Sequence, residues 1–524
     1  MHNPRPTALL SVSDRTGLLD LGRALRGGGY TIYATGGTQA FLAQRGIEAI
    51  EVGELTGFPP LADGRVKTLH PKVFAGILAD REKLHHLHEL EVHDIPRIDV
   101  VVCNLYPFEE TVRKPGIGMG EAIEQIDIGG VTLIRAAAKN FAGNVCVLVD
   151  PEQYPAFIEH VQAGTFPSFE ERKALAIRAF ERIAEYDAAI ARYMESGQSA
   201  AALPGSLALT MPLESPLRYG ENPQARAAFY LPAGQPFPEQ LQGKALSYNN
   251  LLDLDAALRL LVRPTVPAGH PGLTARGHAR VAIVKHTVPC GVAEREGVSE
   301  AVRAALNADR ISAFGGIVAS DAPIDGAAAK ALGEFFLEIV AAPAYTPDAL
   351  DVFSKKKNLR VLRIDPGLPH RLIGELRVRS ALGGVLADEP DPGFAPEAWE
   401  VVSRRKPTAR EWSDLLFAWG IVRWVKSNGA VIAKDGVSWG VCGGQTNRVW
   451  AVSIAGERAG EHAHGSVCAT DGFFPFADGL EAAAAAGCTA VVAPRGSIRD
   501  AEVIAAADHA GISLVFSTHR FFLH

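Results

Sequence analysis

Two short segments in the first 75 residues carry groups that could hold a phosphate. The run T-G-G-T, Thr35–Thr38, with Gly36 and Gly37 at its centre, lies between a strand-like segment and a helical one. Glycines let the backbone approach a ligand closely, and N–H groups at a helix start attract anions. The run R-V-K-T-L-H-P places Arg65 and Lys67 on one side of an extended segment. Taken alone, the first run is more often an ordinary turn, and the two cations are as often solvated as part of a site.

Further polar groups follow apolar segments and could move protons. Tyr106, in the run C-N-L-Y-P-F with Asn104, follows a very apolar strand, where a tyrosine donates a proton or simply caps a core. Asp127 precedes two glycines that open a helix, and Arg135 and Lys139 share a face of that helix. A lysine near a carboxylate can act as an acid or base once its pKa is tuned. From spacing alone, a surface ion pair is the commoner outcome.

A second set of chemical groups follows residue 215. Lys285 and His286 come directly after the apolar run R-V-A-I-V. A cation there could stabilise an oxyanion, and the histidine could take a proton from an attacking amine. A satisfied histidine beside a solvated lysine is nevertheless the commoner case. The run L-S-Y-N-N-L-L-D, ending at Asp253, indicates a capped helix start. Paired phenylalanines in D-G-F-F-P-F-A-D, 471–478, suit a flat ring such as a pterin unless they are packed in a core. Other polar candidates are Arg218, Tyr219, Ser427, Asn428, Gly444, Gln445 and Arg448.

The composition is typical of a soluble globular protein. The chain has 524 residues, of which 47% are hydrophobic and 21% charged, so we expect two or three domains. A formal net charge of -7 argues against nucleic-acid binding through a basic surface. With no long apolar run and no signal-peptide core, we expect no membrane span. Six scattered cysteines without a C-x-x-C pair argue against a disulfide framework or a cysteine-rich zinc site and favour the cytoplasm.

Strand-like and helical segments alternate through the first 200 residues. Apolar runs at 8–12 and in Y-T-I-Y-A-T, I-E-A-I-E-V, R-I-D-V-V-V and N-V-C-V-L-V are separated by segments with helical spacing. This alternation predicts a mostly parallel sheet with helices on both faces, which binds ligands at the carboxyl ends of its strands. A long amphipathic helix and a stretch rich in small residues then indicate a domain boundary near residue 200. The region 200–524 again mixes strands and helices, and we expect it to divide near residue 375.

The motifs of the first region occur together in one enzyme family. They are S-V-S-D-R-T-G, T-G-G-T, L-T-G-F-P, G-R-V-K-T-L-H-P-K-V, C-N-L-Y-P-F and E-Q-I-D-I-G-G-V-T-L-I-R-A-A-A-K-N. From Thr7 to about residue 200, the chain closely resembles the inosine monophosphate (IMP) cyclohydrolase domain of the bifunctional purine biosynthesis proteins. The resemblance implies a methylglyoxal-synthase-like α/β fold for residues 1–199.

The same resemblance implies roles for residues of this domain. The nucleotide phosphate would lie against Ser13, Arg15 and the turn Thr35–Thr38, with Arg15 standing where lysine is usual. Substrate would also contact Arg65, Thr68 and Asn104. The closing ring would be lined by Lys67, Tyr106, Asp127 and Lys139. Ring closure requires attack of the carboxamide nitrogen on the formyl carbon and loss of water, and these groups can stabilise the oxygen and deliver protons without a metal.

The second region resembles the aminoimidazole carboxamide ribonucleotide (AICAR) formyltransferase half of the same proteins. The match runs from about Ser215 to the C-terminus and includes K-K-K-N-L-R-V-L, P-T-A-R-E-W-S-D-L-L-F-A-W, K-S-N-G-A-V-I-A-K-D-G and G-S-I-R-D-A-E-V-I-A-A-A-D. It implies two cytidine-deaminase-like α/β units in residues 200–524 without the deaminase zinc, in keeping with the missing H-x-E and P-C-x-x-C motifs. It also implies 10-formyltetrahydrofolate as cosubstrate, no tightly bound cofactor, formylated AICAR (FAICAR) as the intermediate, and a homodimer with transferase sites at the subunit interface.

In this half the resemblance implies His286 as the base and Lys285 as its partner. The aminoimidazole nucleotide would be held by Arg218, Tyr219, Gly315, Glu338, Asn428 and Arg448. The folate would face Phe473, Asp478, Ser497 and Arg520.

Several positions depart from the family pattern. Val288 stands where asparagine is usual, Gly472 where alanine is common, Arg495 where glycine is common and Leu523 where arginine is common, and the run 440–450 also differs. A valine cannot make the hydrogen bonds of asparagine, and a lost bond to a ligand can cost about 1–3 kcal/mol. We still expect both activities to persist, because the Lys–His pair and Arg448 remain.

Other interpretations are weighed against this one. A cyclohydrolase with an impaired transferase half is the first. A non-catalytic nucleotide-sensing module is the second, since methylglyoxal-synthase-like domains also serve as allosteric binders, but the intact set of Lys67, Tyr106, Asp127 and Lys139 argues against it. A zinc deaminase is disfavoured by the missing ligands, and a nicotinamide dehydrogenase because no G-x-G-x-x-G follows the first strand.

Overall fold

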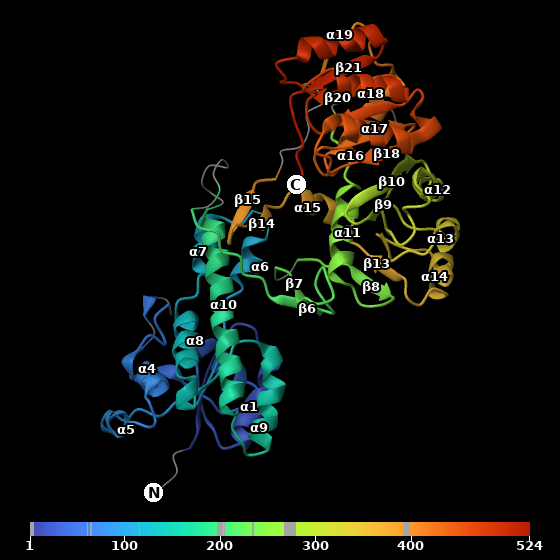
Figure 1. The fold of residues 1–524 in the computed structure, drawn as a ribbon. Coiled ribbons are helices and arrows are strands. Elements are labelled where there is room, and N and C mark those ends of the chain that lie inside the picture. Colours follow the sequence, from blue (N-terminus) through green and yellow to red (C-terminus); the bar gives the residue numbers. More distant parts are fainter. Residues whose placement is uncertain are drawn as a thin grey trace. The chain divides into compact units, whose positions relative to one another are not determined.

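The computed structural model describes residues 5–59, 61–62, 65–114, 116–195, 203, 205–232, 235–266, 279–390 and 399–524. The chain divides into two compact units, Met1–Met211 and Pro212–His524 (Figure 1), and each is described by itself. The boundary expected near residue 200 lies outside the described residues.

The first unit is built on a five-stranded parallel sheet. Its strands are β1 (Thr7–Val12), β2 (Thr31–Ala34), β3 (Ile50–Glu51), β4 (Val100–Asn104) and β5 (Cys146–Leu148), in the spatial order β3-β2-β1-β4-β5. Successive residues of β1 enter different cores, Leu9 on one face and Leu10 on the other. Apolar strands of this kind are expected where a parallel sheet is covered on both faces. The α/β architecture predicted for this region is confirmed.

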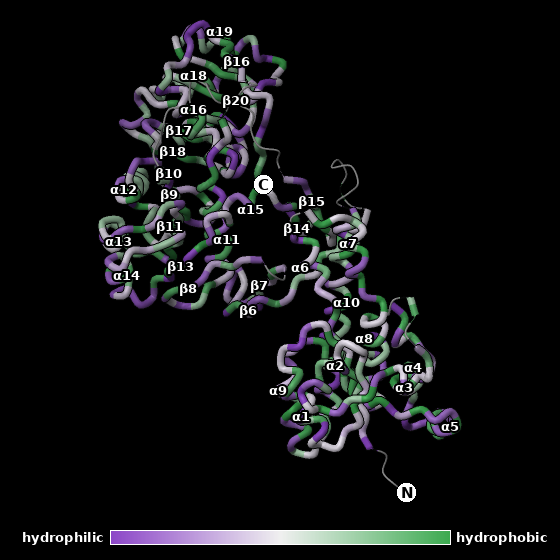
Figure 2. The backbone as a smooth tube through the Cα atoms, turned by 180° about the vertical axis from the view of Figure 1, so that it is seen from behind, coloured by the Kyte–Doolittle hydropathy of each residue, from purple (hydrophilic) through white to green (hydrophobic). Residues whose placement is uncertain are grey.

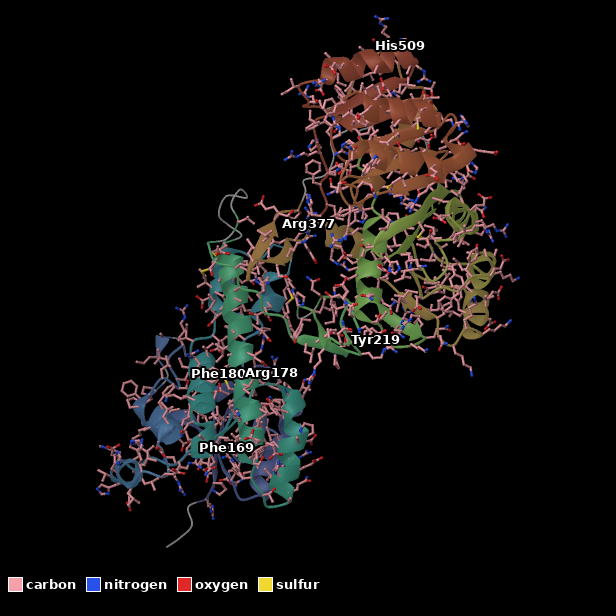
Figure 3. All side chains as sticks on the ribbon, viewed as in Figure 1. Phe169, Arg178, Phe180, Tyr219, Arg377 and His509 are labelled. Carbon is pink, nitrogen blue, oxygen red and sulfur yellow. The ribbon has the colours of Figure 1, made fainter. Side chains whose placement is uncertain are left out.

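Helices cover both faces of this sheet. The core around Leu10 includes α1 (Leu18–Gly27), α2 (Gly36–Ala43) and α9 (Tyr154–Gln162), and hydrophobic and hydrophilic stretches alternate along α1 and α9 in Figure 2. The core around Leu9 includes α4 (Pro71–Leu78), α8 (Gly129–Lys139) and α10 (Phe169–Glu195). Arg178 of α10, labelled in Figure 3, binds Asp150 at 2.9 Å and Glu185 at 3.0 Å. The shorter helices are α3 (Val52–Thr56), α5 (Leu84–Val92), α6 (Phe108–Val112) and α7 (Met119–Glu124), with 3₁₀ turns at Phe141–Gly143 and Pro151–Gln153.

The order of the strands reverses between β1 and β4. These strands are neighbours in the sheet, with Val12 of β1 opposite Asn104 of β4. The chain leaves β1 toward β2 and leaves β4 toward β5, so the two connections diverge. A crevice opens at such a switch point, at the carboxyl ends of the strands.

The second unit is built on a twelve-stranded sheet with the spatial order β16-β21-β20-β19-β17-β18-β10-β9-β11-β12-β13-β8. The strands of its first half are β8 (Glu239–Gln242), β9 (Ala279–Lys285), β10 (Val288–Arg295), β11 (Ile317–Ser320), β12 (Ile339–Ala342) and β13 (Arg360–Arg363). Those of its second half are β16 (Glu400–Val401), β17 (Ala430–Lys434), β18 (Val437–Cys442), β19 (Val467–Thr470), β20 (Ala490–Pro494) and β21 (Ser513–Ser517). Two strand pairs lie outside the sheet, β6 (Leu213–Leu217) with β7 (Ala227–Tyr230), and β14 (Arg377–Ala381) with β15 (Gly384–Asp388).

The helices of the second unit also lie on two faces. One core includes α11 (Tyr248–Arg259) and α16 (Ala409–Val422). On the other face, α12 (Val298–Ala308), α13 (Gly326–Gly333) and α14 (Pro347–Ser354) pack on the first half, while α17 (Arg448–Ala459), α18 (Asp478–Ala486) and α19 (Asp500–Ala510) pack on the second. The chain between the halves holds α15 (Leu368–Ile373), and a 3₁₀ turn spans Gly460–Ala463.

The two halves of this sheet repeat one topology. In the first, β9 runs antiparallel to β10 and β11, the strands β11, β12 and β13 are parallel, and β8 is antiparallel to β13. In the second, β17 runs antiparallel to β18 and β19, the strands β19, β20 and β21 are parallel, and β16 is antiparallel to β21. The unit therefore contains an internal repeat. Residue 375 lies in the connection between the two copies.

The repeats join through an antiparallel contact between β10 and β18, where Ala293 faces Val437. Because of this direction, β9, β18, β19, β20 and β21 end at the edge of the sheet where β10–β13 and β17 begin. We call it the Lys285 edge, after the last residue of β9. Loops from both repeats therefore lie along the same edge.

Candidate active sites

A cavity of about 790 Å³ lies at the switch point of the first unit. It brings together residues from the ends of β1, β2 and β4 and from segments 65–68 and 123–130. The predicted residues that line it are Ser13, Arg15, Thr35, Gly37, Thr38, Arg65, Lys67, Thr68, Asn104, Tyr106 and Asp127. The sequence separates these residues by up to 114 positions, so their convergence comes from the fold.

The start of α2 forms one wall of this cavity. Thr35 has the extended backbone of an N-cap residue, but its side chain does not cap the helix and lies 3.3 Å from the hydroxyl of Ser11. Arg15 donates to the carbonyl of Gly37 at 3.4 Å. Thr38 is buried, accepts from the N–H of Val12 at 3.1 Å and donates to its carbonyl at 3.3 Å. The helix start thus keeps backbone N–H groups beside a cation, which is the arrangement that binds phosphate.

Asn104 fixes the loop that follows β1. Its side-chain oxygen accepts from the N–H of Ser13 at 2.6 Å and from the N–H of Asp14 at 2.9 Å, and its amide donates to the carbonyl of Asp14 at 2.9 Å. A single side chain at the end of β4 therefore sets the backbone of the neighbouring loop. Asn104 both lines the cavity and holds its wall.

Asp127 and Tyr106 carry shifted pKa values in this cavity. Burial raises the pKa of Asp127, while the backbone N–H groups of Gly130 and Tyr106 and the charge of Lys67 act in the opposite direction. The carboxylate accepts from the N–H of Gly130 at 2.7 Å. Burial and then the charge of Asp127 raise the pKa of Tyr106, so its phenol keeps its proton at neutral pH. The protonated phenol of Tyr106 and the ammonium of Lys67 can together stabilise an oxyanion.

Two predicted residues are not among those that line this cavity. Gly36 is the first residue of α2 but does not line it. Lys139 is exposed and is the last residue of α8, whereas Gly129 and Gly130 at the start of that helix do line the cavity. A helix of 11 residues spans about 15 Å, so Lys139 lies at the opposite end. The structure does not bring Lys139 to the other site residues.

Lys285 and His286 lie at a tight hairpin of the second unit. His286 and Thr287 form the two-residue turn between β9 and β10, with left-handed φ values of 55° and 61°. Asp253 of α11 accepts from both of their backbone N–H groups, at 3.2 Å from His286 and 2.5 Å from Thr287. Lys285 donates to the carbonyl of Phe314 at 2.8 Å, beside Gly315. A cavity of about 780 Å³ next to this turn is lined by Lys285, His286, Val288, Pro289, Cys290, residues 307–312, Trp439, Val441 and Arg458.

Asn428 and Arg448 meet in a buried network on the same edge. Arg448 pairs with the fully buried Asp471 and donates to the side-chain oxygen of Asn428 at 2.7 Å. Asp471 also accepts from the N–H of Gly429 at 2.9 Å and from the hydroxyl of Ser427. This network fixes the orientation of the guanidinium.

The remaining predicted residues of the second unit are spread along the Lys285 edge and the loop after β6. Glu338 pairs with Arg360 at 2.6 Å at the start of β13. Phe473, Asp478, Ser497 and Arg520 follow β19, β20 and β21. Arg218 stacks over Tyr219 at 4.8 Å from the ring centroid, in the loop after β6 (Figure 3 labels Tyr219). That loop contacts the start of α11 through Asn249, which donates to the carbonyl of Glu221 at 3.3 Å.

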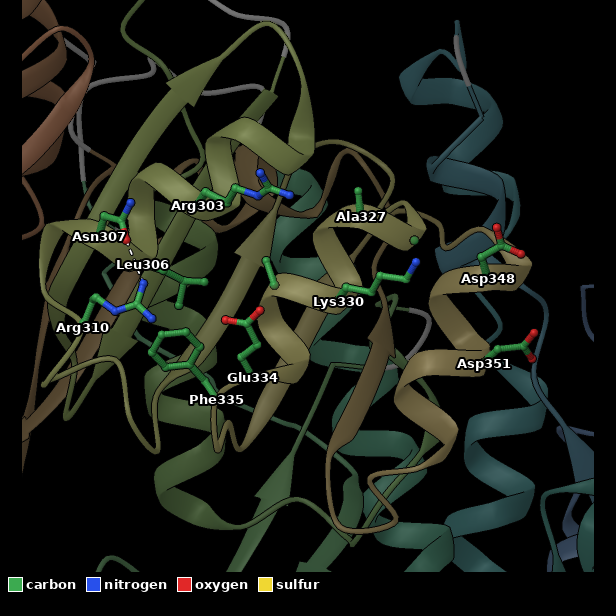
Figure 4. A pocket seen from close by; sticks show the side chains of 12 residues that line it. Arg303, Leu306, Asn307, Arg310, Ala327, Lys330, Glu334, Phe335, Asp348 and Asp351 are labelled. Atoms are coloured by element: carbon green, nitrogen blue, oxygen red, sulfur yellow. Dashed lines mark hydrogen bonds between the residues drawn. The ribbon is translucent and has the colours of Figure 1, made fainter.

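A third cavity, of about 830 Å³, lies among α12, α13 and α14 (Figure 4). Arg303, Arg310 and Lys330 line it together with Asp348 and Asp351, so charges of both signs meet there. No residue singled out from the sequence lines this cavity. It therefore adds nothing to the predicted chemistry.

Comparison with known proteins decides the family. The model of the "AICARFT/IMPCHase bienzyme" family matches residues 137–458, and that of the "MGS-like domain" matches residues 17–132. The chain belongs to the AICARFT/IMPCHase bienzyme family. It is 48% identical to the bifunctional purine biosynthesis protein PurH of Synechococcus sp., over 99% of this chain and 100% of that protein. It is 47% identical to PurH of Chloroflexus aurantiacus (99% and 98%) and 45% to PurH of Desulfitobacterium hafniense (99% and 99%).

Membership in the AICARFT/IMPCHase family confirms the predicted function. The protein is a bifunctional enzyme of purine biosynthesis, with AICAR formyltransferase and IMP cyclohydrolase activities. The two alternatives, a cyclohydrolase with an impaired transferase half and a non-catalytic nucleotide-sensing module, are not favoured. Within the described residues, no group of three or more His, Cys, Asp or Glu side chains is placed to hold a metal ion. None of the described helices is long and apolar enough to cross a membrane.

Departures from the family pattern find different structural settings. Val288 opens β10 opposite Lys285 and lines the cavity beside the turn, where a valine offers no hydrogen-bonding side chain. Gly472 packs against Arg448. Arg495 is exposed and reaches Glu400 at 3.8 Å, and Leu523 accepts from the N–H of Ser427 through its backbone carbonyl, a bond that any residue can make.

Three residues that support these sites were not singled out in the sequence analysis. Tyr186 of α10 accepts from the N–H of Asp127 at 2.8 Å and donates to the carbonyl of Gln125 at 2.8 Å. Asp471 anchors Arg448, and Asp253 holds the His286 turn. Asp253 and Asp471 stood at the ends of noted motifs, whereas Tyr186 lies in a helix whose pattern gave no signal.

Proposed function

We propose that the first unit closes the ring of FAICAR at the switch-point cavity, and that the second transfers the formyl group at the Lys285 edge. The convergence of a helix start, Lys67, Tyr106 and Asp127 on one cavity carries the first assignment. It fits an anionic nucleotide whose phosphate lies at α2 while its base reaches Asp127. In the domain ranges expected from the sequence, residues 1–199 would carry out ring closure and residues 200–524 formyl transfer.

Ring closure joins the carboxamide nitrogen of FAICAR to its formyl carbon and then expels water. The formyl oxygen gains charge as the carbon–nitrogen bond forms, and the Lys67 ammonium and the Tyr106 hydroxyl can stabilise it. The nitrogen loses a proton and the departing oxygen gains one, so the cavity must accept and return protons. We assign this exchange to Asp127, whose carboxylate accepts from the N–H of Gly130 and whose own N–H donates to the hydroxyl of Tyr186.

Formyl transfer joins the amine of AICAR to the formyl carbon of 10-formyltetrahydrofolate. The tetrahedral oxyanion lies within reach of the Lys285 ammonium, and the exposed His286 imidazole takes the proton of the attacking amine. The bond from the formyl carbon to the folate nitrogen then breaks, and that nitrogen takes a proton. Arg448 and Asn428 support the nucleotide, and Phe473, Asp478, Ser497 and Arg520 face the folate, with no tightly bound cofactor required.

We further propose that the transferase works as a homodimer in the cytoplasm. Ile311, Phe314 and Phe336 are 89%, 59% and 50% exposed, and the rings of Phe314 and Phe336 contact each other next to Gly315 with their centroids 5.3 Å apart. Apolar side chains exposed beside a site favour coverage by another surface. A second copy of this chain fits that need, since the neighbouring His286 cavity is open to solvent on the same edge.

Separate assays of the two reactions test the assignment. FAICAR alone measures ring closure, and AICAR with 10-formyltetrahydrofolate measures transfer. We expect Asp127→Asn to lose closure and keep transfer, and His286→Ala to do the reverse. An Asp127→Asn protein that still closes FAICAR at the wild-type rate would overturn the first half, and His286→Ala at the wild-type transfer rate the second.

A further inference from the structure

The turn that carries His286 adopts a backbone that its residues disfavour. His286 and the β-branched Thr287 both have positive φ, at 55° and 61°. Side chains other than glycine rarely occupy this region, and β-branched ones least of all. Such strain persists only where surrounding groups impose it. The carboxylate of Asp253 is the group that does so, because it accepts both backbone N–H groups of the turn.

The second repeat contains the same arrangement with residues better suited to it. Asp435 and Gly436 form the turn between β17 and β18, with φ values of 53° and 66°. Asp414 of α16 accepts from their N–H groups at 3.0 and 2.9 Å, as Asp253 of α11 does in the first repeat. Asp-Gly is a favoured pair for a two-residue hairpin. The fold therefore needs only a turn of this shape, and an Asp-Gly pair meets that need.

The correspondence extends to the lysine before each turn. Lys434 donates to the carbonyl of His464 at 2.7 Å, as Lys285 donates to the carbonyl of Phe314 at 2.8 Å. The glycines that follow these carbonyls, Gly315 and Gly465, have φ values of 76° and 69°. The two repeats thus share a scaffold and differ at the tip of the hairpin.

We infer that Asp253 is a positioning residue for formyl transfer, which holds His286 in the left-handed turn that aims it along the Lys285 edge. This rests on the proposed role of His286 as the base. Asparagine at 253 would offer one acceptor oxygen and turn its amide toward the second N–H. The turn would relax toward conformations better suited to histidine and threonine, and the imidazole would leave its place.

Kinetics of three variants test this inference. Asp253→Asn is expected to lower kcat for transfer about tenfold to a hundredfold, the equivalent of one lost charged hydrogen bond, with little change in KM for AICAR. Asp414→Asn is the matched control: it removes the same device from the second repeat and is expected to keep transfer within about twofold. Asp253→Asn with Thr287→Gly is expected to recover most of kcat, because glycine adopts the turn unaided. Ring closure by the first unit, measured on each sample, normalises the amount of folded enzyme.

The outcomes separate this inference from the proposed function. If wild type transfers formyl groups and His286→Ala does not, the function stands. The inference is then overturned if Asp253→Asn matches wild type, if Asp414→Asn loses as much kcat, or if Thr287→Gly gives no recovery. If Asp253→Asn does not fold, the double variant decides alone, since activity near wild type supports the inference and folded but inactive protein contradicts it. If His286→Ala keeps transfer, the proposed function has failed instead.

Discussion

Gly472 lies so close to Arg448 that a β-carbon on the glycine would stand 2.5 Å from Nη2 of the guanidinium. It would also stand 2.8 Å from the ring of Phe522. The position where the family commonly has alanine is thus filled here by neighbouring side chains. The arginine can approach its buried partner, Asp471, because the glycine leaves room.

Gly472→Ala is therefore expected to harm the second unit although it restores the common residue. Overpacking of this kind costs about 1–3 kcal/mol, so the melting temperature should fall and KM for AICAR should rise as Arg448 is displaced. Gly297→Ala is the control, since a β-carbon there would meet no atom within 4 Å. Thermal melting and transfer kinetics measure both. Equal behaviour of the two variants would contradict the packing argument.

Asp127→Asn is expected to separate stability from activity in the first unit. Burial raises the pKa of Asp127, so the folded state binds this proton more tightly than the unfolded state. Ionising the buried carboxyl therefore lowers the free energy of unfolding. This loss is absent at pH values below the ordinary pKa of a carboxyl group and develops as the pH rises through the raised pKa. Asparagine does not ionise, so at neutral pH the melting temperature of the variant should be no lower than that of wild type. Any advantage of the variant in melting temperature should disappear in acid, where Asp127 is protonated. Ring closure should fall about 10²- to 10⁴-fold, as expected for a lost acid–base group. Lower stability of the variant at neutral pH would disprove the stability part.

Exchanging the tip of the first hairpin for that of the second should stabilise the protein and abolish transfer. His286→Asp combined with Thr287→Gly places at both positions residues that tolerate a positive φ, and the strain that is relieved at such a position is about 1–3 kcal/mol. The melting temperature of the second unit is expected to rise while ring closure stays unchanged. Calorimetry with both activity assays checks this. A fall in melting temperature would show that the left-handed turn carries no strain.

Asn104→Ala is expected to loosen the phosphate wall of the first cavity. Two backbone N–H groups, of Ser13 and Asp14, would lose their acceptor and bond to water instead, so the loop after β1 would no longer be held in one conformation. KM for FAICAR should rise about tenfold or more. The corresponding nucleoside, which lacks the phosphate, should show a much smaller change. A similar loss for both substrates would place the effect elsewhere in the cavity.

The sequence predicts the sheet of the first unit well, because five apolar runs separated by helical segments leave few other arrangements. It also predicts the cavity residues that follow β1, β2 and β4, since the carboxyl ends of parallel strands meet. Lys139 shows the limit: its motif resembled that of the family, but the helix that begins at the cavity carries it away. Asp253 and Asp471 act on residues distant in the chain, and such pairings leave no local pattern. The internal repeat is equally hidden, since the copies share a lysine and a valine around turns of different composition.

The antiparallel contact between β10 and β18 gives the duplication an unequal outcome. It reverses the strand direction of one copy relative to the other, so the hairpins that follow Lys285 and Lys434 lie at opposite edges of the sheet. Loops of the second copy lie with His286 along the Lys285 edge. The Asp435–Gly436 hairpin lies at the opposite edge and carries none of the predicted transferase residues. The duplication therefore gives one site built from both copies in place of two, and substitutions in those loops of either copy that lie along the Lys285 edge should affect the same reaction.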